Sequence, residues 1–116
     1  ILVKGSRVLV MGLTFKENCP DVRNTRIVDV VSELNKYGCR VDVFDPWADA
    51  DEAEHEYGLR PVKRVKPATY DAVIMGVGHK EFRDMGVKKV RALGKKTHVL
   101  YDIKYVFKSE EVDGRL

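Results

Sequence analysis

The stretch that decides the fold is LVMGLTFKENCPDVRNT, residues 9–25. It starts with apolar residues that end at Gly12, a pattern typical of a buried parallel strand. A loop with Lys16 and Arg23 follows, and Asn24 is placed to cap a helix at its N-terminus. Because open α/β sheets bind ligands at the carboxyl ends of their strands, we expect this loop at a binding edge. Two cations beside a helix N-terminus suit an anion such as phosphate.

The next elements continue the α/β pattern. Apolar residues recur at helical spacing over residues 27–34, and Gly38 provides the stop. A second strand is expected over residues 40–45, because Pro46 cannot continue a central ladder. A polar helix is expected over residues 49–57.

Strands and helices keep alternating towards the C-terminus. We expect a short edge strand at residues 60–62, a buried strand at 70–77, a helix at 87–93 and a last strand at 97–102. This alternation implies right-handed crossovers and a parallel sheet covered on both faces. The predicted fold is therefore α/β, a Rossmann-like three-layer α/β/α sandwich of about five strands. The expected order is edge strand, second strand, first strand (residues 7–12), and then the two later strands.

Composition limits the function classes. A chain of 116 residues fits one domain, and 44% hydrophobic with 34% charged residues is ordinary for a soluble globular protein. A net charge of +3 with interspersed signs gives no reason to expect a nucleic-acid or membrane partner. Cys19 and Cys39 lack metal or redox spacing, so we expect no metal site and free thiols in a reducing cytoplasm. The chain begins with Ile1 rather than Met, and we expect it to be a piece of a longer protein.

The loop after the first strand lacks the pattern of a dinucleotide site. Such a site needs three glycines in a tight strand-to-helix turn, and residues 9–25 contain only Gly12. Asp45 ends the second strand where a dinucleotide site places its ribose-binding carboxylate. Without the glycines, we favour a turn role for Asp45. NAD pyrophosphate is therefore not expected to bind this domain in the standard way.

Cations form the candidate anion site instead. Phe15 and Lys16 indicate recognition by side chains, and Lys104 follows the last strand, so we expect it at the same sheet edge as Lys16. A lysine there acts on a diphosphate as a point charge. The alternative is that Lys16, Arg23 and Lys104 are ordinary solvated charges.

Two further side chains stand near strand ends. His79 follows the strand at residues 70–77, and an imidazole suits a general base, but the sequence assigns it no partner acid or nucleophile. We favour a structural or ligand-edge role, such as a loop-to-helix cap with Lys80 and Glu81. Trp47 either stacks on a base or packs half-buried.

Five motifs together resemble a known family. GLTFKEN (residues 12–18) and DVRNT (21–25) are similar to the opening motif of the C-terminal, UDP-binding domain of the UDP-glucose/GDP-mannose 6-dehydrogenase family. The similarity continues through VFDPW (43–47), VGHKEF (77–82) and YDIK (101–104), and so covers nearly the whole chain. The first motif is most similar to the bacterial branch that oxidises UDP-N-acetylhexosamines for surface polysaccharides.

The resemblance implies roles for individual residues. In the family, the residues matching Phe15 and Lys16 contact the UDP-sugar, and the one matching Arg23 reaches the NAD cofactor, which another domain mainly holds. Lys104 stands about where the family places a basic residue, commonly Arg, that binds the substrate.

The resemblance also implies the activity of a longer protein, an NAD-dependent UDP-sugar 6-dehydrogenase. It oxidises the sugar C6 hydroxyl to a carboxylate in two hydride transfers, through a thiol-bound intermediate. Residues 1–116 are then a single UDP-binding domain, inactive alone, whose partners are the UDP-sugar and the N-terminal and central domains of a cytoplasmic homo-oligomer. The family nucleophile lies in a Gly-Pro-Cys setting in the central part, so neither Cys19 nor Cys39 is expected to be catalytic.

Two other classes compete with this interpretation. A response-regulator receiver has a similar fold and a lysine after its last strand, matching Lys104. It needs an acidic pair after the first strand to hold Mg²⁺, where this chain has Met11 and Gly12. A stand-alone Rossmann-like ligand-binding or regulatory module is also permitted, because a fold does not fix a function.

Overall fold

The computed structural model describes residues 4–115, and the expectation drawn from Ile1 falls outside that range. Its strands and helices alternate along the chain, as the hydrophobic pattern predicts. In order, the elements are β1 (Arg7–Met11), α1 (Ile27–Lys36), β2 (Arg40–Phe44), α2 (Ala50–Tyr57), β3 (Tyr70–Met75), α3 (Lys80–Arg91), β4 (Gly94–Asp102), the 3₁₀ helix η1 (Ser109–Glu111) and β5 (Gly114–Arg115).

The sheet is parallel, with the strand order β2-β1-β3-β4-β5. Met11 of β1 pairs with Phe44 on one side and Met75 on the other, and Met75 pairs with Asp102. Four strands therefore end in register, and their exit loops share one carboxyl edge. The predicted α/β class and parallel sheet are confirmed.

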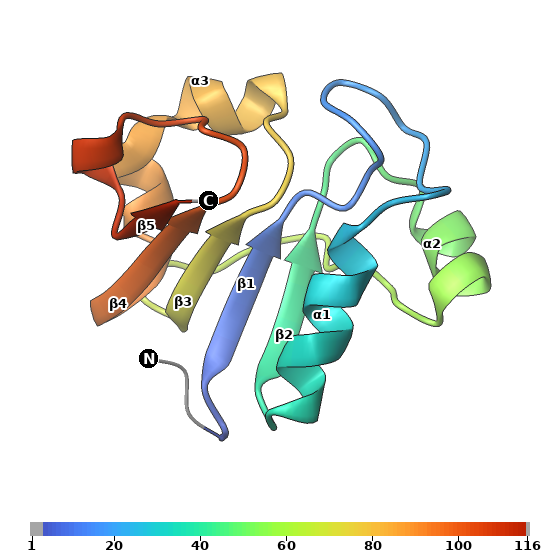
Figure 1. The fold of residues 1–116 in the computed structure, drawn as a ribbon, viewed down its shortest axis with the longest axis horizontal. Coiled ribbons are helices and arrows are strands. Elements are labelled where there is room, and N and C mark those ends of the chain that lie inside the picture. The colour runs from blue at the N-terminus through green and yellow to red at the C-terminus, as the bar shows by residue number, and fades with distance from the viewer. Residues whose placement is uncertain (1–3, 116) are drawn as a thin grey trace.

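The hydrophobic core lies on both faces of the sheet. Side chains alternate along β1, so Val8 and Val10 face the α1 layer, whereas Leu9 and Met11 pack with Phe82 of α3. Figure 1 shows α1 in front of β1 and β2, with α3 on the opposite side. This arrangement is the predicted three-layer sandwich.

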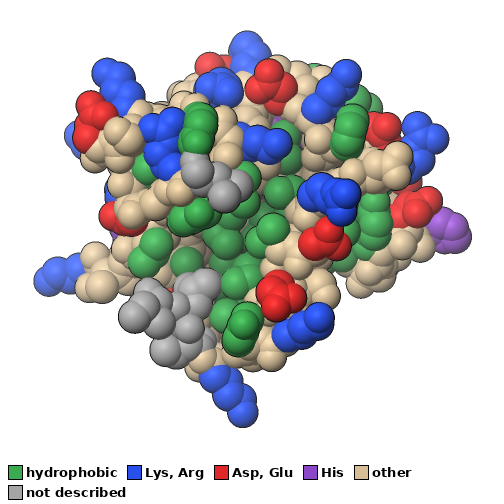
Figure 2. All heavy atoms as spheres, in the orientation of Figure 1, with side chains coloured by type: hydrophobic (Ala, Val, Ile, Leu, Met, Phe, Trp, Pro, Cys, Tyr) green, Lys and Arg blue, Asp and Glu red, His purple; other side chains and the backbone are tan. Residues whose placement is uncertain are grey.

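The face that carries α1 has mixed charge. Figure 2 shows lysines and arginines interspersed with acidic side chains around its rim, and apolar side chains gathered in a shallow hollow at its centre. No field of one sign, of the kind that attracts a polyanion, is visible on this face.

The edge strand predicted at residues 60–62 is wrong. Val62 donates its N–H to the carbonyl of Val43 at 2.7 Å, but Pro61 has no N–H to donate, and residues 60–62 form no strand. The fifth strand is instead the two-residue β5, which pairs with β4 at the other edge of the sheet. The order therefore begins with β2.

Two predicted helix starts are also wrong. Asn24 does not cap α1; it has a φ of 59°, and Arg26 occupies the N-cap position. The helix predicted at residues 87–93 begins at Lys80 instead. Gly86, with a φ of 80°, kinks α3 in the middle and breaks its helical pattern in the sequence.

Candidate functional site

Three predicted site residues line one hollow at the carboxyl edge of the sheet. The side chain of Phe15 is 55% exposed there, and Lys16 lies next to it in the loop after β1. Lys104 enters from the loop after β4. The hollow measures about 280 Å³ and is lined by Phe15, Lys16, Glu17, Val77, Gly78 and Lys104.

A second hollow extends this site to the N-terminus of α1. It measures about 150 Å³ and shares Phe15, Val77 and Lys104 with the first. Arg26 and Ile27, at the start of α1, line its other side. The positive end of a helix dipole thus lies beside the cations, an arrangement that favours an anion.

A close approach of two loops shapes this edge. Gly12, at the end of β1, has a φ of 103°, which favours glycine. A Cβ at Gly12 would lie 2.6 Å from the backbone N of Val77, after β3. The two exit loops can therefore run side by side only because position 12 has no side chain.

The loop that carries Lys104 is fixed by a buried carboxylate. Asp102 ends β4, and its carboxylate accepts hydrogen bonds from the N–H of Lys104 at 3.1 Å and of Phe107 at 2.8 Å. The Lys104 side chain therefore extends from a backbone that is held in place.

Asp45 has the predicted turn role and a second one that sequence reasoning missed. Its Oδ1 accepts the N–H groups of Trp47 at 2.8 Å and Ala48 at 3.3 Å, which closes the turn after β2. Its Oδ2 accepts those of Leu13 at 2.6 Å and Thr14 at 3.0 Å, in the loop after β1. Burial alone would raise the pKa of Asp45, but hydrogen bonds from His79, Leu13 and Thr14 outweigh it and lower the pKa below its usual value.

Arg23 lies apart from the two lysines. Its guanidinium pairs with Asp21, with 3.1 Å between Nε and Oδ1, and both groups are at the surface. Hydrogen bonding within this pair lowers the pKa of Asp21 and raises that of Arg23. Arg23 lines a different hollow with Arg26, Asp29 and Glu56. The structure brings Phe15, Lys16 and Lys104 together, but not Arg23.

His79 and Trp47 lie beneath the loop after β1. His79 is fully buried at the N-cap position of α3, yet its side chain does not cap that helix. Trp47 is half-buried, its ring centroid lies 6.0 Å from that of His79, and its indole N–H donates to Glu81 at 2.8 Å. Both positions favour the packing roles over catalysis or base stacking.

The residues present do not fit a dinucleotide. The chain between β1 and α1 runs from Gly12 to Arg26, too long for the tight glycine-rich turn of a dinucleotide site, and the Asp45 carboxylate is 5% exposed and engaged inside the protein. It therefore cannot receive a ribose. Within residues 4–115, no group of three or more His, Cys, Asp and Glu side chains could hold a metal ion. Cys39 is buried, and Cys19 is half-buried and unbridged.

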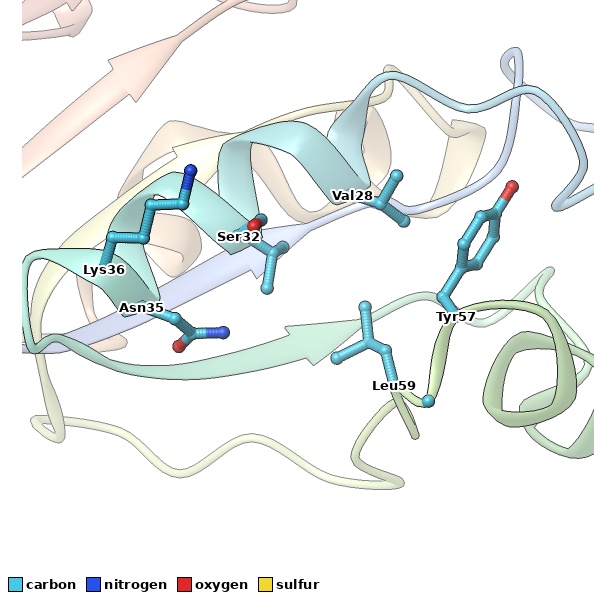
Figure 3. A pocket seen from close by; sticks show the side chains of 8 residues that line it. Val28, Ser32, Asn35, Lys36, Tyr57 and Leu59 are labelled. Atoms are coloured by element: carbon cyan, nitrogen blue, oxygen red, sulfur yellow. The ribbon is translucent and has the colours of Figure 1, made fainter.

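A larger hollow, of about 460 Å³, lies between α1 and the end of α2. Figure 3 shows Val28, Tyr57 and Leu59 around it, with Lys36 at one end. The Lys36 ammonium lies 3.7 Å from Glu33. Because this hollow flanks the sheet and contains none of the predicted site residues, we place the site at the carboxyl edge. None of the helices within residues 4–115 is long and apolar enough to span a membrane.

Sequence reasoning missed several residues that shape the site. Arg26 carries no signal, since it follows Arg23 in a loop of ordinary polar residues. Asp102 could have been found, because it ends a strand directly before the Lys104 loop, as Asp45 ends β2. Thr14 has no distinguishing signal in the sequence, because only the fold brings its hydroxyl next to the imidazole of His79.

The fold defines the class: a doubly wound α/β domain with a cation-lined hollow at its carboxyl edge. Residues 9–109 match the model of the UDP-glucose/GDP-mannose dehydrogenase family, UDP binding domain. The chain belongs to this family, and the predicted membership is confirmed.

Named relatives and solved structures agree with this family. The chain is 60% identical to the UDP-N-acetyl-D-glucosamine 6-dehydrogenase of Salmonella typhi and 55% identical to that of Pseudomonas aeruginosa, over 116 residues each. All of the chain is covered, against 27% and 28% of those proteins. A UDP-glucose dehydrogenase from Pyrobaculum islandicum has a TM-score of 0.72 and 28% identity, over 97% of this chain and 25% of that one. The chain thus spans about a quarter of the length of the relatives it matches.

Proposed function

We propose that this chain is the nucleotide-binding domain, residues 1–116, of an NAD-dependent nucleotide-sugar 6-dehydrogenase whose substrate is a UDP-N-acetylhexosamine. The observation that carries the proposal is the hollow in which Lys16 and Lys104 lie beside Phe15 and the N-terminus of α1. The family description and the names of the relatives support a uridine diphosphate as its ligand.

Each site residue then has a distinct task. Lys16 and Lys104 neutralise the diphosphate as point charges, aided by the positive end of α1. Phe15 offers an exposed aromatic ring to the nucleoside. Arg23, outside the hollow, reaches the NAD that the other domains hold.

The chemistry belongs to the whole enzyme. The C6 hydroxyl of the sugar is oxidised to a carboxylate in two hydride transfers to NAD, and the thiol nucleophile and the NAD site lie outside this chain. We place the enzyme in the bacterial cytoplasm, as a homo-oligomer that makes precursors of surface polysaccharides. In it, this chain contacts the N-terminal and central domains.

The competing proposal is a stand-alone ligand-binding or regulatory module of the same fold. Identity of 55–60% over the whole chain to two proteins named as 6-dehydrogenases favours the enzyme. A stand-alone module, by contrast, would function without the other three quarters of such an enzyme.

One pair of measurements on the chain 1–116 tests the proposal. Two charge-assisted hydrogen bonds of about 1.5–3 kcal/mol each sum to about 3–6 kcal/mol, which corresponds to a Kd for UDP between roughly 40 μM and 6 mM. We therefore expect saturable UDP binding by calorimetry and no reduction of NAD with any UDP-sugar, because the chain has neither a dinucleotide loop nor a nucleophile in its family setting. Absence of UDP binding, or NADH formation above background by the pure chain, would contradict the proposal.

A further inference from the structure

The buried imidazole of His79 makes hydrogen bonds at both ring nitrogens. The backbone N–H of Asn18 donates to Nδ1 at 2.9 Å. Nε2 lies 2.9 Å from Oδ2 of Asp45 and 3.1 Å from Oγ1 of Thr14. Three parts of the chain that are far apart in sequence thus meet at one side chain.

These contacts fix the position of the proton. Because the N–H of Asn18 is a donor, Nδ1 must be the acceptor, and the ring proton lies on Nε2. That N–H is shared between the carboxylate of Asp45 and the hydroxyl of Thr14. The Thr14 hydroxyl in turn donates to the carbonyl of Lys16 at 3.0 Å. His79 is therefore held as one neutral tautomer in a continuous chain of donors and acceptors.

The loop from residue 13 to residue 18 wraps around this pair. Asp45 holds its first two N–H groups, and His79 holds its last one. Asn18 has a φ of 54°, a conformation that asparagine tolerates, and its side-chain oxygen accepts the N–H of Lys80 at the start of α3 at 2.8 Å. Lys16 lies between these anchored ends, with its carbonyl bound and its ammonium exposed.

We propose that His79 and Asp45 are positioning residues that hold residues 13–18 in the one shape that presents Lys16 to the diphosphate. The inference rests on the proposed function, because it concerns the same site. Neither residue touches the ligand. His79 is fully buried, and Asp45 nearly so. They hold the backbone of residues 13–18. Their loss should therefore make this loop less ordered without ligand and should weaken its affinity for UDP.

Two substitutions separate the two sides of the imidazole. In His79→Gln, the amide nitrogen replaces Nε2 as a donor to Asp45, but no acceptor remains for Asn18. In His79→Asn, the side-chain oxygen replaces Nδ1 as that acceptor. We expect amide exchange at Asn18 to accelerate at least tenfold in His79→Gln, with UDP binding to the chain 1–116 weakened three- to tenfold. His79→Asn should retain most of the protection at Asn18.

A core variant controls for simple loss of stability. Val90 is fully buried near the other end of α3 and takes part in none of the hydrogen bonds described for this group. Val90→Ala should lower Tm while UDP affinity and amide exchange at residues 13–18 stay unchanged. If the His79 variants do not fold, Thr14→Val removes the hydroxyl that links His79 to the carbonyl of Lys16 and should still weaken UDP binding.

The outcomes separate this inference from the proposed function. Unchanged exchange in a folded His79→Gln, or a loss of UDP affinity in Val90→Ala equal to that in the His79 variants, overturns the positioning role. If the unsubstituted chain does not bind UDP, the proposed function fails, and the exchange measurements still decide whether His79 holds the loop.

Discussion

Lys16→Ala is expected to weaken UDP-sugar binding by roughly ten- to a hundredfold in the complete dehydrogenase. A charge-assisted hydrogen bond to a phosphate contributes about 1.5–3 kcal/mol when water is excluded, and about 1.4 kcal/mol is a factor of ten. In the isolated chain the hollow is open, and solvent screening should limit the loss to about tenfold. Because the nucleotide is remote from C6, KM should rise with kcat nearly unchanged.

The matched control is Lys36→Ala. Lys36 is an exposed lysine at the C-terminal end of α1, at the opposite edge of the sheet, and its loss changes the net charge equally. Arg23→Ala should act on the KM for NAD instead. An unchanged KM for the UDP-sugar in folded Lys16→Ala would remove the substrate role of this loop.

Asp45→Ala should lower the free energy of unfolding by more than about 3 kcal/mol, because each buried donor left without an acceptor costs about 1–3 kcal/mol. The substitution leaves four backbone N–H groups and the imidazole of His79 without their acceptor, and the donors of Leu13, Thr14 and His79 are buried. Denaturant titration measures the loss. Asp49→Ala is the control, because its exposed carboxylate accepts one N–H, that of Glu52, and such a cap is worth about 1 kcal/mol. Equal losses in the two variants would contradict the anchoring role of Asp45.

The same carboxylate predicts a pH dependence. The pKa of Asp45 is lower in the folded chain than in the unfolded one, whose value is about 3.9. The unfolded state therefore binds the proton first, so the contribution of Asp45 to stability is complete above about pH 4 and is lost as pH falls through the folded pKa. The stability difference between the unsubstituted chain and Asp45→Ala should shrink over that range.

Strong local signals made much of the fold predictable. Ile27 and Val31 are spaced to bury one face of α1, and both are buried. The polar helix ends at Tyr57, as predicted. Gly58 follows it, and this glycine adopts the φ of 65° that ends the helix. Capping residues and periodicity are properties of adjacent residues, which a sequence shows directly.

The errors arise where tertiary contacts decide. The two-residue strand β5 has no pattern of its own and forms only because β4 offers an edge. The predicted strand at residues 60–62 was the same kind of short segment, placed at the wrong edge. The first half of α3 was missed in the sequence because Gly86 interrupts the helical pattern. Phe82 in that half is fully buried, as expected for an amphipathic segment.

The arrangement of the candidate site was predictable in part for a similar reason. Lys16 and Lys104 follow strands that end in register, so the parallel-sheet rule places them at one edge. The bond of Asp45 to His79 joins residues 34 positions apart. No spacing rule predicts such a bond, since it depends on how β1, β2 and β3 lie side by side.

Mapping UDP on the chain 1–116 by NMR tests the central claim most directly. With added UDP, amide shifts should change at residues 14–18, 76–79 and 103–105 and at the start of α1, all at the carboxyl edge. Changes confined to the amino edge, or to the hollow between α1 and α2, would contradict the assignment of the site.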